Sequence, residues 1–309
     1  MAVVTESPAP ARAAPAPPAR RSRRVNRPSS WYLLPAMAFF GLFAAFPLVL
    51  VLYLSFTDWT GIGTPAFIGV DNWVRLFEND AIWDVTWTTL LLTMLFWVTQ
   101  TPLSILLGVW AAGPQRNRAV LSALFFLPLL LSTAAIALLF NRLFDPYVGI
   151  GRGLEPFRNI LGTSSGAITA IVIMVGWQFI PFHTLLYQAA ARNIPQVLYD
   201  AATVDGAGRW HMFWYVTLPQ LRNTIITSST IMIVGSLTYF ETIFLLTSGG
   251  PGTATRTLPL EMYFRSFRSY EFGYASTIAS VLVIVATAVS LVIVKFSGFA
   301  KMRSTMEGL

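Results

Sequence analysis

Three residues of one apolar segment have side chains that could bind a polar molecule. They are Trp177, Gln178 and Phe182. Gln178 and Phe182 are four residues apart, so they share one face of a helix. Aromatic rings stack on sugar rings and amides bond hydroxyl groups, which is the mixture that a saccharide site needs. We interpret this segment as a candidate binding region. The alternative for Trp177 and Gln178 is packing between helices.

A second apolar segment holds Glu241, the only acidic residue that we place within such a segment. Charged groups there are costly and therefore informative. Tyr239 and Thr242 are three residues apart and share a helix face, whereas Glu241 lies beside Thr238. These side chains cannot all line one narrow stripe. Glu241 could pair with a partner subunit or contact a substrate hydroxyl.

Other polar residues in apolar segments have ordinary structural explanations. Ser132 and Thr133 follow Pro128 and are candidates for substrate contact. Such hydroxyls more often bond back to the helix backbone. His183 could relay a proton, but a lone histidine is more often a packing residue.

Catalytic and metal-binding patterns are missing from the sequence. The chain has no Cys, no H-E-x-x-H pattern and no G-x-x-x-x-G-K-[ST] phosphate loop. Its lysines are confined to Lys295 and Lys301. We therefore expect no catalytic residue, no metal site and no cofactor in this chain.

Membrane-spanning helices must position these residues. Of the 309 residues, 55% are hydrophobic and 11% are charged, against about 25% charged in soluble domains. Six stretches reach the roughly 20 residues that cross the hydrocarbon core. They are 31–56, 86–112, 119–141, 166–192, 224–247 and 274–297. The sequence predicts an all-α integral membrane protein with six spans, kinked at prolines (Pro35, Pro47, Pro102, Pro128 and Pro181).

The distribution of Lys and Arg predicts the orientation. Most of them lie near the two termini and in the loops after the second and fourth spans. The positive-inside rule then places both termini and loop 193–222 in the cytoplasm. Residues 1–30 are expected to be a disordered basic tail, and residues 298–309 a second cytoplasmic tail. The net charge of +7 fits this topology and anionic lipid better than nucleic acid.

The loops on the opposite side are too long for simple turns. They cover 57–85, 142–165 and 248–273. Tryptophans in and beside the first loop predict an aromatic belt at the membrane surface (Trp59, Trp73, Trp83 and Trp87). A short helix lying on the membrane could accompany them. Aromatic anchoring alone is the simpler interpretation.

Loop 193–222 is polar and rich in small residues. Pro195 suits the first turn of a helix, and Gly206 and Gly208 are natural terminators. The pattern predicts a helix over 196–205, a tight turn, and a second helix over 209–215 that Leu218-Pro219 ends.

The first of these helices has little side-chain bulk at its centre. Ala201 and Ala202 would let another surface approach the backbone closely, and Asp200 and Asp205 would supply charge at the edge of that contact. An ordinary loop capped by Asp and Gly is the alternative.

The spacing of this loop resembles a known motif. Asp200-Ala201-Ala202 is followed after three residues by Gly206, after nine more by Val216, and after one more by Leu218-Pro219. This resembles the EAA motif of binding-protein-dependent ABC importer permeases, which reads Glu-Ala-Ala, three residues, Gly, nine residues, Ile, one residue, Leu-Pro. Asp200 and Val216 depart conservatively from that pattern.

Other segments resemble the sugar-transporting branch of the family. Asp205-Gly206-Ala207 is similar to its Asp-Gly-Ala. Residues 246–252, Leu-Thr-Ser-Gly-Gly-Pro-Gly, are similar to its Leu-Thr-Gly-Gly-Gly-Pro-Gly, and residues 272–276 match its Phe-Gly-Tyr-Ala-Ser. The resemblance covers about residues 31–297 and is to the maltose-type first permease subunit in a six-span form.

The resemblance implies a type I importer permease fold and a set of partners. The motif helix would dock on a separate ATPase, through Asp200, Ala201, Ala202, Asp205 and Gly206, with Leu218 and Pro219 completing the motif. The ATPase, in two copies, would hold ATP and Mg. A second permease subunit, an extracytoplasmic solute-binding protein and a sugar or oligosaccharide would complete the system in a bacterial plasma membrane. The region before the motif would contribute to the sugar site.

Three alternatives stay open. A glycerol-phosphate importer shares these motifs but would favour Arg or Lys facing the pathway. A proton-coupled secondary transporter would need paired titratable groups and usually internal repeats. A membrane enzyme would need convergent catalytic groups, which the sequence does not show.

Overall fold

The computed structural model describes residues 30–113 and 118–297. The two predicted tails therefore lie outside the described residues, apart from Ser30. The chain divides into two compact units, residues 1–47 and 48–309.

The first unit contributes the beginning of the first apolar helix. A 3-10 turn, Ser30–Leu33, leads into α1 (Leu34–Phe40), a π-helical turn (Gly41–Ala45) and α2 (Phe46–Leu54), which continues into the second unit. Pro35 lies in the first turn of α1, where its missing N–H costs nothing. The run Trp31–Leu54 has a mean hydropathy of 2.4. The first predicted span is thus confirmed as a helix.

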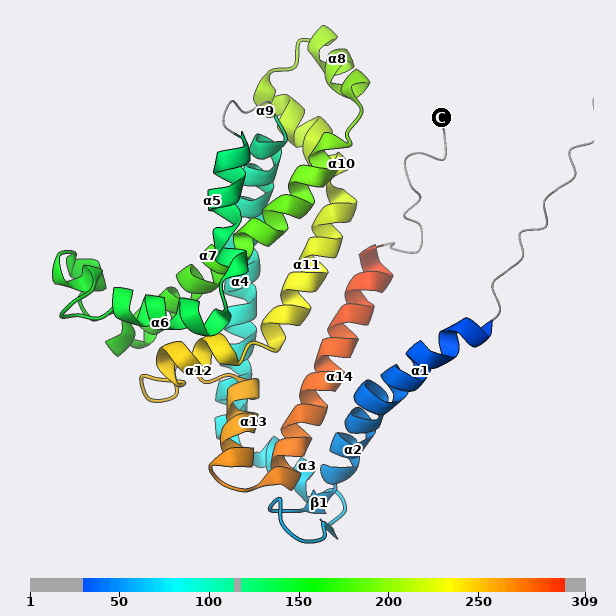
Figure 1. The fold of residues 1–309 in the computed structure, drawn as a ribbon, viewed down its shortest axis with the longest axis vertical. Coiled ribbons are helices and arrows are strands. Elements are labelled where there is room, and N and C mark those ends of the chain that lie inside the picture. Colours follow the sequence, from blue (N-terminus) through cyan, green and yellow to red (C-terminus); the bar gives the residue numbers. More distant parts are fainter. Residues whose placement is uncertain (1–29, 114–117, 298–309) are drawn as a thin grey trace, which may run out of the picture. The chain divides into compact units, whose positions relative to one another are not determined.

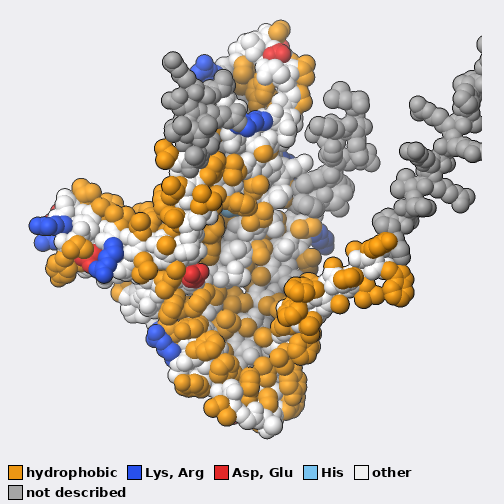
Figure 2. All heavy atoms as spheres, in the orientation of Figure 1, with side chains coloured by type: hydrophobic (Ala, Val, Ile, Leu, Met, Phe, Trp, Pro, Cys, Tyr) orange, Lys and Arg blue, Asp and Glu red, His pale blue; other side chains and the backbone are white. Residues whose placement is uncertain are grey.

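Three long helices form the frame of the second unit: α4 (Asp80–Ala112), α7 (Ser164–Arg192) and α14 (Phe272–Ser297). With Trp31–Leu54 they are the four helices, among the described residues, that are long and apolar enough to cross a membrane. Asn79 starts α4 six residues earlier than predicted, because its Oδ1 accepts a hydrogen bond from the Ala81 N–H at 3.1 Å. Hydrophobic side chains cover most of the face drawn in Figure 2, and charged ones are few.

The third predicted span is broken rather than kinked, so the single helix over 119–141 is wrong. The chain forms α5 (Arg118–Leu130) and α6 (Thr133–Leu143), whose axes differ by 112°. Pro128 has no N–H to continue the ladder. Ser132 then caps a new helix, since its Oγ accepts from the Ala135 N–H at 3.2 Å. If each broken pair counts as one span, the total is the predicted six.

The fifth predicted span is also broken. It consists of α11 (Arg222–Leu237) and α12 (Glu241–Thr247), with axes 53° apart. Residues 238–240 are not helical, so the predicted helical faces of Tyr239 and Glu241 are wrong. Glu241 instead opens α12, where a carboxylate suits the helix dipole.

Short elements occupy the loops 57–85, 142–165 and 248–273. Loop 57–85 contains an antiparallel pair, β1 (Thr57–Asp58) and β2 (Ala66–Phe67), and then α3 (Asp71–Glu78). A short helix, which the sequence favoured less than aromatic anchoring alone, is therefore present, and its position on the membrane stays a prediction. Loop 248–273 contains α13 (Leu258–Phe267), and three 3-10 turns lie between α6 and α7 (Ile150–Arg152, Glu155–Phe157 and Ile160–Gly162).

The segment Phe272–Ser276 acts as a joint between α14 and the first loop. The Gly273 N–H donates to the Trp59 carbonyl at 3.2 Å. A Cβ on Gly273 would lie 1.9 Å from the Thr57 carbonyl oxygen, so only glycine allows this approach. The buried Tyr274 hydroxyl bonds Asn79 at 3.3 Å. The sequence motif over these residues thus has a packing role.

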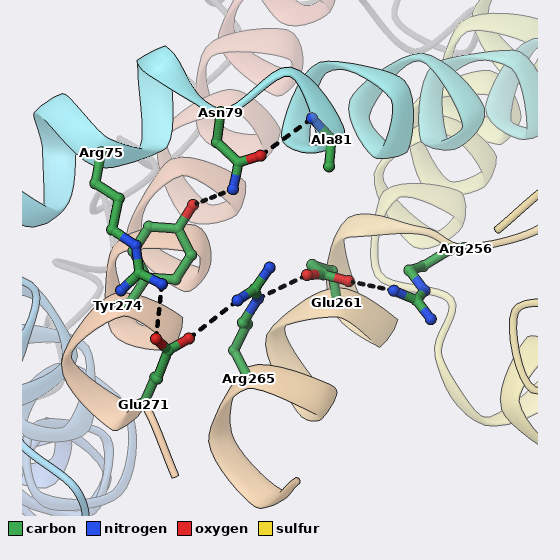
Figure 3. Close-up of polar contacts among 8 residues, drawn as sticks. All are labelled: Arg75, Asn79, Ala81, Arg256, Glu261, Arg265, Glu271 and Tyr274. Atoms are coloured by element: carbon green, nitrogen blue, oxygen red, sulfur yellow. Dashed lines mark hydrogen bonds and ion pairs between the residues drawn. The ribbon is translucent and has the colours of Figure 1, made fainter. Parts of the chain in front are cut away.

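A chain of ion pairs ties the same end of the molecule together (Figure 3). Arg75 of α3 contacts Glu271 at 2.6 Å, and Arg265 of α13 contacts both Glu271 at 3.1 Å and Glu261 at 2.8 Å. Arg256 contacts the other oxygen of Glu261 at 3.3 Å. Because Glu261 is buried, its two guanidinium partners offset the cost of removing its carboxylate from water.

The pH dependence of stability follows from Glu271. Partial burial raises the pKa of its carboxyl, but the Arg75 and Arg265 guanidiniums outweigh this and hold the pKa below the ordinary value of 4.5. A depressed pKa contributes stability above the unfolded-state pKa, and this contribution is lost as pH falls through the folded-state pKa. We expect Glu271→Gln to lower the unfolding temperature in detergent by a constant amount above about pH 5.5. The difference from wild type should shrink below the ordinary pKa; a difference that persists at acid pH would contradict the assignment.

Candidate functional site

The loop 193–222 forms the predicted helix, turn and helix. The first helix, α8 (Gln196–Val204), begins directly after Pro195. Gly206 has a φ of +76°, and the N–H groups of Gly206 and Ala207 donate to the Thr203 and Ala202 carbonyls at 3.0 and 2.9 Å. This is the turn by which glycine ends a helix. The predicted start and end of the first helix are confirmed.

We call α8 the first limb of the loop and the helical segment after Gly208 the second limb. The second limb runs further than predicted. It comprises α9 (Arg209–Met212), a π-helical turn (Phe213–Thr217) and α10 (Leu218–Gln220). Leu218-Pro219 does not end the helix, because Pro219 lies in the first turn of α10, where no N–H is required. The turn into α11 comes one residue after α10, at Leu221.

A buried cluster fixes this limb to the ends of α4 and α7. Ile105, Tyr187 and Leu221 form its centre, and Phe213 and Leu218 pack against them. The Tyr199 hydroxyl of α8 bonds the buried Thr217 Oγ1 at 3.0 Å, which links the two limbs. α8 is therefore linked by a hydrogen bond to the limb that packs against the ends of α4 and α7.

The motif residues of α8 face outward. No side chain of α8 is buried, and α8 lies at the far end of the second unit from α13 (Figure 1). Asp200, Ala201, Asp205 and Gly206 are exposed, and Ala202 is half-buried. Within the described residues, the Asp200 carboxylate accepts a hydrogen bond from Gln196 Nε2 at 3.1 Å and has no Lys or Arg partner. The described part of the chain therefore leaves this surface of α8 exposed.

Leu218 and Pro219 divide between the two sides of the loop. Leu218 packs in the buried cluster, and Pro219 is exposed. Leu218 therefore holds the loop to the bundle, and neither residue belongs to α8.

The polar region within the spans gathers around the break between α5 and α6. Gln178 is 5% exposed, and its Nε2 donates to Thr133 Oγ1 at 3.2 Å. Its Oε1 is buried and has no hydrogen-bond partner. The Trp177 ring is 39% exposed and lies 5.6 Å from Phe140. The structure thus brings together two of the predicted substrate residues, Gln178 and Thr133, while Ser132 caps α6.

The other predicted substrate residues have no hydrogen bond to Gln178 and make different contacts. Tyr239 packs between Phe96 and Phe179, with ring centroids 5.5 and 5.6 Å away. Thr242 is buried. Phe182 is exposed and contacts the ring of His183. Glu241 is exposed and has no ion-pair partner in the part of the chain that the structure describes.

Sequence reasoning missed a set of hydrogen bonds that join the spans. His183 Nδ1 lies 2.8 Å from Ser228 Oγ, and Trp97 Nε1 donates to Ser229 Oγ at 2.9 Å. Gln100 of α4 is almost fully buried, and its Oε1 has no partner. The uncharged polar residues of the apolar spans were the available signal. The bond to Ser228 is the packing role that we expected for a lone histidine.

Broken helices, buried uncharged polar groups and a projecting loop of helix, turn and helix are features of a membrane transport subunit. The chain belongs to the family of binding-protein-dependent transport system inner membrane components, whose match covers residues 104–299. The predicted family and the predicted type I importer permease fold are confirmed. The chain is accordingly a multi-pass permease subunit of an ABC transport system.

Two relatives match over most of their length. A probable ABC transporter permease of Pyrococcus horikoshii is 34% identical and covers 84% of this chain and 92% of the relative. A multiple sugar-binding transport system permease of Streptococcus mutans is 31% identical and covers 88% and 96%. Among solved structures, a bacterial alginate ABC transporter in complex with an alginate pentasaccharide-bound periplasmic protein matches with a TM-score of 0.73 and 25% identity. It covers 91% of this chain and 97% of that chain.

Proposed function

We propose that this chain forms half of the translocation pathway of an ATP-driven importer for a sugar or oligosaccharide. The exposed α8, with Asp200, Ala201, Ala202, Asp205 and Gly206 in the spacing of the EAA motif, is the observation that carries the proposal. The chain would dock there on an ATPase that holds ATP and Mg, and would not hydrolyse ATP itself. A related permease is named for multiple sugars, and a similar structure contains alginate pentasaccharide. Both support a saccharide substrate.

The partners follow from the same assignment. Two ATPase copies need two docking helices, so a second permease subunit of the same fold would supply the other. An extracytoplasmic solute-binding protein would deliver the sugar, and both termini of this chain would lie in the cytoplasm. The unpaired, exposed Glu241 is suited to a contact with the second subunit.

The free oxygen of Gln178 supports a substrate that donates hydrogen bonds. An unpaired buried acceptor costs about 1–3 kcal/mol, and a sugar hydroxyl would satisfy it. The exposed Trp177 ring beside it offers a stacking surface. A phosphate would instead need a cation, but α4, α12 and α7 before Arg192 contain no Lys or Arg. Sugar is therefore favoured over glycerol phosphate.

Reconstitution of the whole transporter tests the proposal. The chain, its partner permease, the ATPase and the binding protein would be placed in proteoliposomes with a panel of mono- and disaccharides and glycerol 3-phosphate. We expect uptake of a saccharide that needs ATP and the binding protein and persists with a protonophore. Uptake that needs the proton gradient and not ATP would overturn the importer assignment, and uptake of glycerol 3-phosphate alone would overturn the substrate class.

Gln178→Leu tests the substrate contact. We expect turnover per assembled complex to fall about tenfold, the equivalent of one lost hydrogen bond of roughly 1.4 kcal/mol. ATPase assembly should be unchanged. Gln188→Leu is the matched control, since Gln188 is buried in the same helix but bonds the Ala111 carbonyl at 2.8 Å. That variant should lose stability and keep its turnover. Equal loss of turnover in both variants would contradict a substrate role for Gln178.

A further inference from the structure

The second limb of loop 193–222 combines buried and exposed side chains. Phe213 packs against the buried cluster at the ends of α4 and α7, and Thr217 is buried. The same limb carries Trp210, Trp214 and Tyr215, which are 66%, 46% and 76% exposed. We call these three residues the aromatic patch.

The rings of the aromatic patch contact one another, and both tryptophans also contact Phe213, at 5.9 Å for Trp210 and 5.5 Å for Trp214. Trp210 and Trp214 lie 5.7 Å apart, and Tyr215 stacks on His211 at 5.9 Å. These four side chains line a shallow hollow of about 360 Å³. Exposed aromatic rings grouped in this way mark a surface that a membrane or another molecule covers.

Charge distinguishes the two limbs of the loop. Residues 193–208 contain two acids, Asp200 and Asp205, and no Lys or Arg. Residues 209–222 contain Arg209 and Arg222 and no acid. An anionic membrane surface would attract the second limb and repel the first. The limb that carries the aromatic patch is therefore complementary to anionic lipid headgroups.

The position of the limb agrees with this complementarity. It leads directly into α11, whose first residue is Arg222. Exposed Trp110 and Arg192 lie near the ends of α4 and α7, which the same limb contacts. Trp, Tyr and Arg at the ends of spans mark the headgroup level, because their polar tips reach water while their rings or stems stay apolar.

We propose that the aromatic patch, with Arg209 and Arg222, docks in the anionic headgroup layer of the cytoplasmic leaflet. The lipid surface then supports one side of the loop and leaves α8 pointing into water. The depth of α8 below the membrane surface depends on anionic lipid. Since α8 is the helix that we assign to ATPase docking, the coupling helix, the ATP-driven step depends on anionic lipid too. The inference rests on the proposed function for placing the loop in the cytoplasm and for assigning α8 to ATPase docking.

Spin labels can measure the depth of each limb, because the chain has no cysteine of its own. Tyr215→Cys reports on the patch, and Val204→Cys on α8 is the matched exposed position. The full transporter, with cysteine-free partners, would be placed in vesicles of phosphatidylcholine with 30% phosphatidylglycerol. We expect the label at 215 to be shielded from an aqueous nickel chelate and accessible to oxygen, with and without the ATPase. The label at 204 should be open to the chelate until the ATPase binds.

Charge removal tests the lipid contribution. Arg209→Gln with Arg222→Gln, or removal of phosphatidylglycerol, should shift the label at 215 toward water. The ratio of labels in the headgroup layer to labels in water should fall about fivefold for each cation lost. Shielding at 215 that appears only with the ATPase would overturn the proposal, because the patch would then belong to the ATPase interface. Equal chelate access at 215 and 204 in all vesicles would overturn it too. If the chelate access of the label at 204 does not change when the ATPase binds, the assignment of α8 to ATPase docking is contradicted. The result for the lipid contact at 215 does not depend on that outcome.

Discussion

Gly108→Val is expected to prevent stable folding of the helix bundle. Gly108 lies where α4 and α7 cross, and a Cβ at this position would meet Tyr187 Cβ at 2.6 Å and both Gln188 N and the Thr184 carbonyl at 3.0 Å. These are backbone and Cβ atoms, so no side-chain rotation relieves the clash. The two helices would have to separate along their contact, and small residues are what permit such approach in membranes.

The effect should be graded and specific to this crossing. Overpacking costs about 1–3 kcal/mol and sometimes more, so Gly108→Ala should lower the unfolding temperature in detergent, and Gly108→Val should abolish monodisperse protein. Gly176→Ala in α7 is the control, because its new Cβ would meet only Ile180 Cδ1 at 3.5 Å. Wild-type yield and stability for Gly108→Val would show that the helices are not packed this closely.

Gly206→Pro is expected to abolish ATP-driven uptake while the spans stay folded. Proline fixes φ near −65°, whereas Gly206 has a φ of +76° and donates its N–H to the Thr203 carbonyl. The end of α8 would therefore unwind at the surface that we assign to the ATPase. No atom lies within 4 Å of a Cβ at this position, so the damage is confined to the turn.

Two further variants separate backbone strain from general damage. Gly206→Ala should cost roughly 1 kcal/mol for the left-handed conformation and reduce uptake only in part. Gly208→Ser should be neutral, because Gly208 has an extended backbone with a φ of −72° and precedes α9, where serine is a good cap. ATPase co-purification and uptake in proteoliposomes are the measurements. Normal uptake by Gly206→Pro with normal ATPase assembly would refute the coupling role of α8.

Loop 193–222 could be predicted from the sequence because the residues that begin and end its helix are local. Pro195 begins α8 and Gly206 ends it within one short segment, so capping rules suffice. The broken spans were predicted less well. Whether Pro128 kinks or breaks a helix depends on the cap that Ser132 provides and on the bond between Thr133 and Gln178, which is 45 residues away in sequence. Hydropathy does not contain that information.

The substrate region shows the same limit. Trp177 and Gln178 could be selected as polar or amphipathic residues in an apolar span, but the partner of Gln178 depends on tertiary structure. We predict Tyr239 as a substrate contact that shares a helix face with Thr242, yet its ring packs between Phe96 and Phe179 and the helix is broken between the two residues. Glu241 was placed mid-helix because the break at 238–240 carries no Gly or Pro.

The joint between α14 and the first loop also constrains how the chain is made. The carbonyls of Ser55 and Trp59 accept hydrogen bonds from Thr277 and Gly273, and Arg75 pairs with Glu271, 196 residues later. These partners leave the ribosome about 200 residues after the groups that they contact. The first loop must therefore wait, with its acceptors solvated, until α14 has been made. A chain truncated before Phe272 would leave the Ser55 and Trp59 carbonyls without these donors, so its first loop would lack the bonds that close it.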